Sequence, residues 1–181
     1  MPHYIHSGMH EHKAKALKNL RYAFVTVSTS RFEAKIGGKT ISDESIEVAK
    51  KLIEANGDTL VEYVLIPDNP RLLLEAFLEL ATREDIDVIV FSGGTGPAPS
   101  DVTIQTLGQV LEKTLTGFGD VFRYLSYNEI GPSAFLTNSV AGIFSGKLVF
   151  LLPGSPNAVK LALEKLILPE SGHILSLARG K

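Results

Sequence analysis

A glycine-rich stretch, "SGGTG" at residues 92–96, follows an apolar run and precedes two prolines and Asp101. Glycine tolerates positive φ and close backbone approach, so successive N–H groups in such a stretch can converge on a phosphate or another anion. The residues concerned are Gly93, Gly94, Thr95 and Gly96. A plain sharp turn uses the same residue types, so the stretch leaves two alternatives, an anion-binding loop or a connection.

The residue order excludes the two common nucleotide loops. A P-loop needs a lysine and then Ser or Thr after its second glycine, whereas Pro97 follows Gly96. The dinucleotide fingerprint needs a third glycine at position 99, which is proline. Any phosphate site here must therefore be of another kind.

Two aspartates stand at predicted strand ends, Asp68 after "TLVEYVLIP" and Asp101 after the glycine stretch. Taken singly, each is more typical of a helix cap or turn former. Taken together, two carboxylates beside an anion-binding loop would repel a phosphate unless a divalent cation lay between them. Mg²⁺ held by one or two carboxylates and substrate phosphates is the usual arrangement for phosphoryl and nucleotidyl transfer. The pair predicts a metal–nucleotide site in which both residues are catalytic and metal-binding.

Two further polar segments follow predicted strands. One is the turn of Pro153, Gly154 and Ser155, in which Ser155 also suits a helix N-cap. The other supplies hydroxyl groups from Ser28, Thr29 and Ser30, followed by Arg31. Both segments are binding candidates, although solvated loop residues would look the same.

The elements that must position these residues alternate along the chain. Apolar runs predict strands at 22–28, 59–68 and 87–92, and two more within 141–155 joined by a Ser145-Gly146 hairpin turn. Helical periodicity predicts helices at 42–57, 69–85, 102–115, 118–128 and 155–170. This order is typical of a doubly wound α/β domain with a mostly parallel sheet and one antiparallel hairpin. The polar segments then share the carboxyl edge of the sheet, where such folds bind ligands.

Length and composition limit the alternatives. The 181 residues fit one domain at 21–181 behind a flexible N-terminal arm at 1–20. A net charge of −2 gives no electrostatic footprint for nucleic acid or an anionic membrane. The absence of cysteine excludes disulfides and thiolate sites and fits a cytoplasmic protein. Four histidines, His3, His6, His10 and His12, lie in the arm, where a metal site is the less favoured interpretation.

Aromatic residues are concentrated in the predicted helix at 118–128, which contains Phe118, Phe122, Tyr124 and Tyr127. They exceed what one short helix needs for its own core, so an oligomer interface is one interpretation. A core-facing helix is the other.

Four ordered motifs, "SGGTGPAPSDVT", "GFGDVFRYLSYNEIG", "SVAGI" and "LPGSPNAVKLALEKLILPE", resemble the MoaB/MogA family of molybdenum cofactor biosynthesis, closer to its MoaB branch. The resemblance runs from about residue 22 to 176. It implies a three-layer α/β/α domain that assembles into trimers or hexamers. It also implies Mg²⁺-dependent transfer of AMP from ATP to molybdopterin, giving adenylyl-molybdopterin and pyrophosphate, with the molybdenum-insertion enzyme as a candidate partner.

The resemblance assigns the catalytic carboxylates to Asp68 and Asp101. It assigns pterin binding to the loop 93–96 and to the turn 153–155. Three segments depart from the family pattern: Ser100 replaces an arginine, residues 137–139 read Thr-Asn-Ser instead of Ser-Arg-Ala, and residues 35–38 lack Asp-x-Ser-Gly. Serine and asparagine cannot replace a bidentate guanidinium in kind, and Arg31, Lys39 and Arg123 are candidate substitutes.

These departures keep two alternatives to the adenylyltransferase open. The first is a protein that binds molybdopterin without adenylylating it, and the second is an assembly role with a vestigial cleft. The sequence leaves the nucleotide, trimer versus hexamer, and molybdenum versus tungsten undecided.

Overall fold

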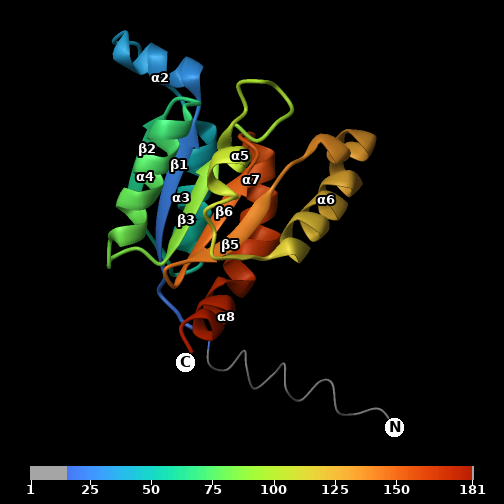
Figure 1. The fold of residues 1–181 in the computed structure, drawn as a ribbon. Coiled ribbons are helices and arrows are strands. Elements are labelled where there is room, and N and C mark those ends of the chain that lie inside the picture. Colours follow the sequence, from blue (N-terminus) through green and yellow to red (C-terminus); the bar gives the residue numbers. More distant parts are fainter. Residues whose placement is uncertain (1–15, 181) are drawn as a thin grey trace.

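The computed structural model describes residues 16–180, in which a six-stranded sheet lies between helices on both faces (Figure 1). The strands are β1 (Arg21–Val27), β2 (Thr59–Ile66), β3 (Val88–Ser92), β4 (Lys113–Thr114), β5 (Val140–Phe144) and β6 (Lys147–Leu152). The helices are α2 (Thr29–Ile36), α3 (Glu44–Ala55), α4 (Pro70–Thr82), α5 (Thr103–Leu107), α6 (Thr116–Ile130), α7 (Pro156–Ala162) and α8 (Leu168–Ala178). A 3-10 helix, η1 (Gly131–Leu136), follows α6, and a π-helical segment, η2 (Leu163–Ile167), joins α7 to α8.

The sheet has the strand order β2-β1-β3-β6-β5-β4. β1 pairs in parallel with β2 and β3, and β3 pairs in parallel with β6. β5 runs antiparallel to both β6 and β4. Ser145 and Gly146 form the turn between β5 and β6 with φ values of 49° and 70°. The predicted mostly parallel sheet with an antiparallel hairpin is confirmed.

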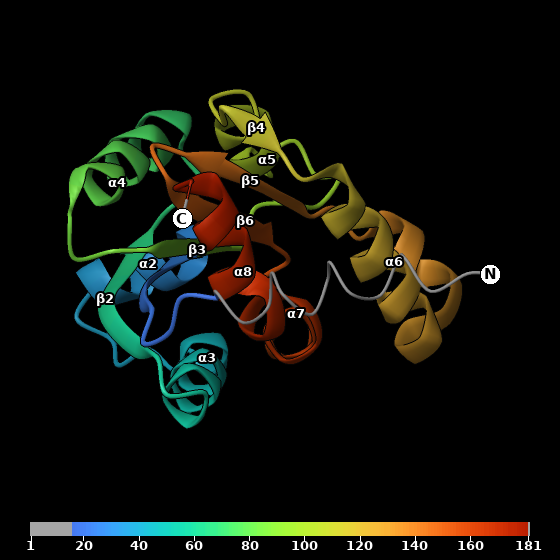
Figure 2. The same cartoon turned by 90° about the horizontal axis from the view of Figure 1, so that it is seen from below.

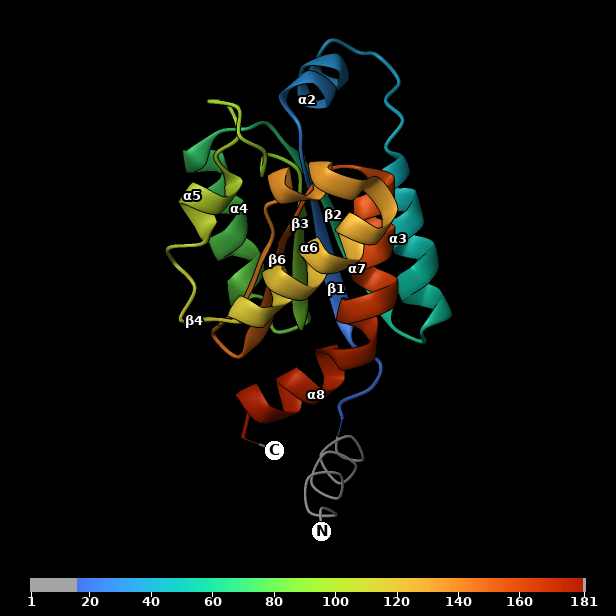
Figure 3. The same cartoon turned by 90° about the vertical axis from the view of Figure 1, so that its right-hand side faces the viewer.

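Alternating residues of the central strands build two separate cores. Tyr22 and Phe24 of β1 point to the face covered by α3, α6, α7 and α8. Ala23 and Val25 point to the opposite face, which α4 and α5 cover. Figures 2 and 3 show these two helical layers from below and from the side. Because both faces are buried, the strands read as continuous apolar runs, and the three-layer prediction is confirmed.

The predicted helix at 102–115 is wrong in its second half. α5 ends at Leu107, and Lys113 and Thr114 form the edge strand β4. Leu115 N donates to Ala141 O at 2.7 Å, next to the β4–β5 ladder. The open edge of β5 therefore captures backbone that the local apolar period assigns to a helix.

The segment after β1 is also not a plain loop. Residues Thr29–Ile36 form α2, which has no buried residue and stands above the carboxyl edge of the sheet (Figure 1). Ser28 is its N-cap, and its side chain accepts a hydrogen bond from Arg31 N at 3.4 Å. The helix was missed because it lacks an apolar face that enters the core.

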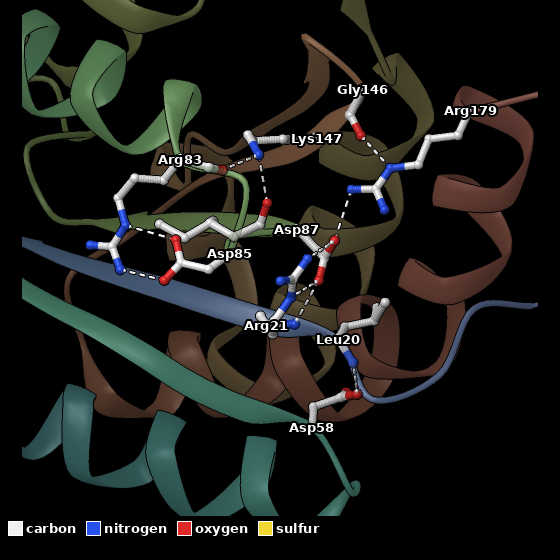
Figure 4. Close-up of polar contacts among 10 residues, drawn as sticks. Leu20, Arg21, Asp58, Arg83, Asp85, Asp87, Gly146, Lys147 and Arg179 are labelled. Carbon is white, nitrogen blue, oxygen red and sulfur yellow. Dashed lines mark hydrogen bonds and ion pairs between the residues drawn. The ribbon is translucent and has the colours of Figure 1, made fainter.

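A polar network closes the opposite, amino-terminal edge of the sheet (Figure 4). The buried Asp87 carboxylate accepts from Arg21 Nε and from an Arg179 Nη atom, each at 2.9 Å. Lys147 Nζ donates to the carbonyls of Arg83 and Ile86, both at 2.6 Å. This network joins β1, β3, β6 and the end of α8. It therefore stabilises the end of the sheet that lies opposite the predicted site.

The last residues of the predicted arm contact the domain. Leu17 N donates to Gly172 O at 3.0 Å, and Leu20 N donates to Asp58 Oδ1 at 2.8 Å. Residues 1–15 lie outside the described residues, and with them the four histidines considered for a metal site. Within residues 16–180, no helix has the length and apolar character needed to cross a bilayer.

Candidate functional site

The parallel strands bring the predicted polar segments to one edge of the sheet. The loops after β3 and β6 are in direct contact, because Gly93 N donates to Leu152 O at 2.9 Å and Ser92 Oγ donates to Pro153 O at 3.3 Å. The segments after β1 and β2 are joined in the same way by Ser28 N and Ile66 O at 2.9 Å. The order β2-β1-β3-β6 therefore places the two pairs side by side.

A cavity of about 390 Å³ opens between the loops after β3 and β6. Residues 93–96, Asp101 and residues 153–155 line it, together with Leu136, Thr137 and Asn138. Asp101 is the one charged side chain among the described lining residues. Ser28, Thr29, Ser30 and Asp68 do not line this cavity, so the structure brings together only part of the predicted set.

Gly93 and Gly94 are required by close backbone approach. Gly93 has φ +115°, and a Cβ built on it would lie 2.1 Å from Val27 O. Gly94 has φ +62°, and a Cβ there would lie 2.5 Å from Thr103 Oγ1 and 2.7 Å from Asp68 Oδ1. Residues with a Cβ rarely adopt such φ values. Both the backbone conformation and the lack of space for a Cβ therefore require glycine at these two positions. The glycine loop thus lies directly against the Asp68 carboxylate.

Asp68 is held by the first residue of α2. Asp68 Oδ2 accepts from Thr29 N at 3.0 Å and from Thr29 Oγ1 at 2.8 Å, and Thr29 Oγ1 accepts from Asp68 N at 3.0 Å. Asn69, not Asp68, caps α4. The helix-cap interpretation is therefore wrong for Asp68, whose second oxygen, Oδ1, lies beside Gly94.

Asp101 stabilises a turn at the other side of the glycine loop. Its Oδ2 accepts from Ala98 N at 2.9 Å, and its own N–H donates to Ala98 O at 2.9 Å. Val102 occupies the N-cap position of α5 and makes no side-chain cap. Asp101 is therefore a turn former, and the helix-cap interpretation is wrong for it too.

Each of the two aspartates keeps one carboxylate oxygen, a ligand type that suits a hard cation. Oδ1 of Asp68 and Oδ1 of Asp101 receive no hydrogen bond among those described for residues 16–180. No group of three or more His, Cys, Asp or Glu in this range could hold a metal ion by itself. Mg²⁺ bound by one or two carboxylates plus substrate phosphates needs no such protein cage. The residues present fit that arrangement.

Leu136 and Ser45 are two residues near the cavity that were missed by sequence reasoning. Leu136, the last residue of η1, lines the cavity together with Thr137 and Asn138, which the family resemblance had already singled out. Ser45, in α3, donates from Oγ to Gly154 O at 2.9 Å. The sequence signal for Ser45 was limited to its place at the start of the predicted helix at 42–57, and in the structure Asp43 is the N-cap of α3.

The candidate substitutes for the missing arginines lie elsewhere. Arg31 and Lys39 are not among the residues that line the cavity. Arg123 forms an ion pair with Asp120 at 2.7 Å and lines a separate cavity of about 290 Å³. Where the family pattern has arginine, Asn138 lines the cavity with a neutral side chain.

Comparison with known proteins agrees with this geometry. Residues 23–173 match the family model described as "Probable molybdopterin binding domain". A "Probable molybdopterin adenylyltransferase" of Methanocaldococcus jannaschii is 44% identical over 165 residues, which are 91% of this chain and 98% of that protein. "Molybdenum cofactor biosynthesis protein B" of Bacillus anthracis is 41% identical, over 91% of this chain and 94% of its own.

A solved structure shares the fold as well. The tungsten cofactor synthesizing protein MoaB from Pyrococcus furiosus superposes with a TM-score of 0.79 at 37% identity, covering 91% of this chain and 99% of that one. Sequence and fold thus agree over most of both chains. The chain belongs to the MoaB/MogA family of molybdenum cofactor biosynthesis, within its MoaB branch.

Proposed function

We propose that the protein is a molybdopterin adenylyltransferase. In this reaction an oxygen of the terminal phosphate of molybdopterin attacks the α-phosphorus of ATP, the bond to the β-phosphate breaks, and pyrophosphate leaves. The observation that carries the proposal is the pair of aspartates on either side of the glycine loop, since each is fixed by backbone or Thr29 contacts and neither caps a following helix. The name of the Methanocaldococcus jannaschii relative supports the same activity.

The chain's own residues perform positioning in this proposal. The loops 93–96 and 153–155 line the cavity, and their backbone N–H groups, apart from Gly93 N, which donates to Leu152 O, are the proposed donors to the phosphate of the pterin. Thr29 and the Ala98 turn fix the aspartates, so little reorganisation is needed when a charged substrate enters. Asp68 and Asp101, together with substrate phosphates, would hold Mg²⁺, which would neutralise the charge that develops during transfer.

The low number of cations in the cavity favours a second candidate function. Asp101 is the one charged side chain among the described lining residues, so no described Lys or Arg of the cavity clamps the triphosphate. A protein that binds molybdopterin without transferring AMP would show the same loops. The retained aspartates favour the transferase, because a pure binder of an anion gains nothing from two carboxylates.

Product formation separates the two functions. Purified protein is mixed with molybdopterin, Mg²⁺ and either ATP or GTP, and pyrophosphate and adenylyl-molybdopterin are measured. The proposal predicts stoichiometric release of both products with ATP, which also fixes the nucleotide. Binding of molybdopterin in a calorimeter, with no pyrophosphate released and no heat on addition of Mg·ATP, would establish the binder instead.

Two further parts of the proposal concern the setting of the reaction. The substrates are small molecules. We place the reaction in the cytoplasm because the chain has no cysteine and therefore none of the disulfides that many proteins of oxidising compartments contain. The molybdenum-insertion enzyme is the proposed recipient of the product. The metal inserted downstream follows from that enzyme and not from the residues around this cavity.

A further inference from the structure

The turn after β6 is held by a residue from a different layer of the molecule. Ser45 lies in the first turn of α3, is only 1% exposed, and donates from Oγ to Gly154 O at 2.9 Å. On its other side Gly154 packs against the glycine loop, since a Cβ built on Gly154 would lie 3.2 Å from Gly93 Cα. The Gly154 carbonyl is therefore fixed from α3 while the turn itself borders the cavity.

A buried carboxylate in turn fixes Ser45. Asp43 is 6% exposed, and its Oδ1 accepts from Ser45 N at 3.1 Å. Its Oδ2 accepts from Thr26 Oγ1 at 2.6 Å and from the Tyr63 hydroxyl at 2.9 Å. Burial and the hydrogen bond to Asp43 raise the pKa of Tyr63 to about 12, so the hydroxyl stays a donor at neutral pH. Residues of β1, of β2 and of the turn after β6 thus converge on the start of α3.

The orientation of the Gly154–Ser155 peptide determines which of its polar groups can face the cavity. The chain has no cis peptide bond within residues 16–180, so the Gly154 C=O and the Ser155 N–H point in opposite directions from one rigid plane. With the carbonyl turned toward Ser45, the Ser155 N–H points away from α3. Ser155 lines the cavity, and the hydrogen bonds described for residues 16–180 give this N–H no acceptor.

We propose that Ser45 is a positioning residue that holds the Gly154–Ser155 peptide so that the Ser155 N–H binds an anionic oxygen of the substrate in the cavity. The inference rests on the proposed function for the identity of that substrate, whose anionic group is a phosphate. Without the Ser45 hydroxyl the peptide is free to rotate and to present its carbonyl, which repels a phosphate. Ser45 acts through Gly154 and has no contact with the substrate itself.

The test compares two buried serines that each donate from Oγ to a backbone carbonyl, one to a distant turn and one within its own helix. Ser45→Ala removes the donor to Gly154 O, and Ser126→Ala removes a donor at 2.8 Å to Phe122 O inside α6. Urea unfolding should show similar losses of stability, because each variant loses one buried hydrogen bond. We expect kcat/KM for molybdopterin to fall about 10- to 100-fold in Ser45→Ala and to stay within about 2-fold of wild type in Ser126→Ala. Equal activities of the two variants would overturn the proposal.

A second readout separates this inference from the proposed function. If wild type forms no adenylyl-molybdopterin, the proposed function fails, and molybdopterin binding by calorimetry then tests Ser45 alone. The inference predicts a weaker affinity in Ser45→Ala than in Ser126→Ala, and an amide resonance of Ser155 that shifts on adding molybdopterin to wild type but not to Ser45→Ala. An unshifted Ser155 amide in the wild-type complex contradicts it.

A milder variant keeps the test available if Ser45→Ala does not fold. Tyr63→Phe removes one of the donors to Asp43 and leaves every residue of the cavity in place. The start of α3 loosens, so we expect a loss of about 2- to 5-fold in molybdopterin affinity relative to Ser126→Ala. An unchanged affinity in Tyr63→Phe, together with an unchanged Ser155 amide shift, counts against the inference.

Discussion

At the residue scale, aspartate carboxylates have different roles at the two edges of the sheet. Asp68 and Asp101 are half-buried, and each uses Oδ2 to fix nearby backbone, while no described hydrogen bond reaches Oδ1. Asp87 uses both oxygens for arginines, so its charge is fully compensated. The first pair is suited to a ligand and the second arrangement to stability.

Asp87 predicts a specific acid dependence of stability. Burial raises the pKa of this carboxyl, but hydrogen bonds from Arg21 and Arg179 outweigh burial and hold the pKa below its usual value. A carboxyl with a lowered pKa in the folded state adds stability above its unfolded pKa of about 3.9, and the gain is lost as the pH falls through the folded pKa. We expect Asp87→Asn to unfold about 1–3 kcal/mol more easily at pH 7 and to lose less stability on acidification than wild type.

Urea unfolding at pH 7, 5 and 3.5 checks this expectation. Asp120→Asn is the matched control, because that carboxylate pairs with Arg123 on the surface and contributes little. If the free energy of unfolding fell by the same amount between pH 7 and pH 3.5 in Asp87→Asn and in wild type, the result would count against the role assigned to Asp87.

At the element scale, the packing of the segment at Leu17 on α8 depends on close backbone contact. A Cβ built on Gly172 would lie 2.2 Å from Leu17 O, although Leu17 N donates to Gly172 O at 3.0 Å. Alanine normally stabilises a helix relative to glycine by about 0.5–1 kcal/mol. We expect the reverse here, with Gly172→Ala less stable by about 1–3 kcal/mol because the segment at Leu17 is displaced.

Gly117 supplies the control for this prediction. It lies in α6 with no atom within 4 Å of its hypothetical Cβ, so Gly117→Ala should follow the normal helix preference and raise the melting temperature slightly. Thermal unfolding of both variants measures the difference. Gly172→Ala with an increased melting temperature would show that the Leu17 segment does not need this contact.

The sequence predicted those elements whose causes are local. Strands at the centre of the sheet read as apolar runs, and the N-cap Ser155 and the Ser145-Gly146 turn are recognised from their neighbouring residues alone. α2 was missed because it has no apolar face that enters the core, and β4 was missed because β5 offers the partner edge. In the β4 segment, helix propensity gave way to long-range pairing.

The candidate site likewise has a part that the sequence predicts and a part that long-range contacts decide. The carboxyl ends of parallel strands must meet at one edge, so the loops at 93–96 and 153–155 were predictable as neighbours. The family resemblance pointed to Asn138, but no local pattern predicted the other residues that act on the cavity from outside the sheet. Leu136 reaches it from η1, and Ser45 acts on its border from a helix in another layer.

At the scale of the whole molecule, α6 and η1 carry an apolar surface. Phe122 is buried and stacks on Phe118, as the core-facing interpretation requires. Tyr124, Tyr127 and Phe135 are 67%, 57% and 76% exposed. The core-facing interpretation is thus confirmed for Phe122, while the interface interpretation stays a prediction for the exposed tyrosines. We propose that this exposed face forms the contacts of a homo-oligomer, a trimer or a hexamer.

Sedimentation velocity tests that assembly. Wild type should sediment as a trimer or hexamer, and the double variant Tyr124→Glu, Tyr127→Glu should sediment as a smaller species because charges enter an apolar contact. Leu78→Glu, at an exposed position on α4, is the control and should keep the wild-type mass. A monomeric wild type at micromolar concentration contradicts the proposed assembly.

The central claim is that the aspartates beside the glycine loop carry out transfer chemistry. Its most direct measurement is the single-turnover rate of AMP transfer from Mg·ATP to molybdopterin in Asp101→Asn. Asparagine can still accept from Ala98 N, so the turn is kept while the charge is removed. Asp85→Asn, at the opposite end of β3 and paired with Arg83, is the control. We predict a loss of at least about 100-fold in Asp101→Asn and a wild-type rate in Asp85→Asn. A folded Asp101→Asn protein with the wild-type rate would contradict the account.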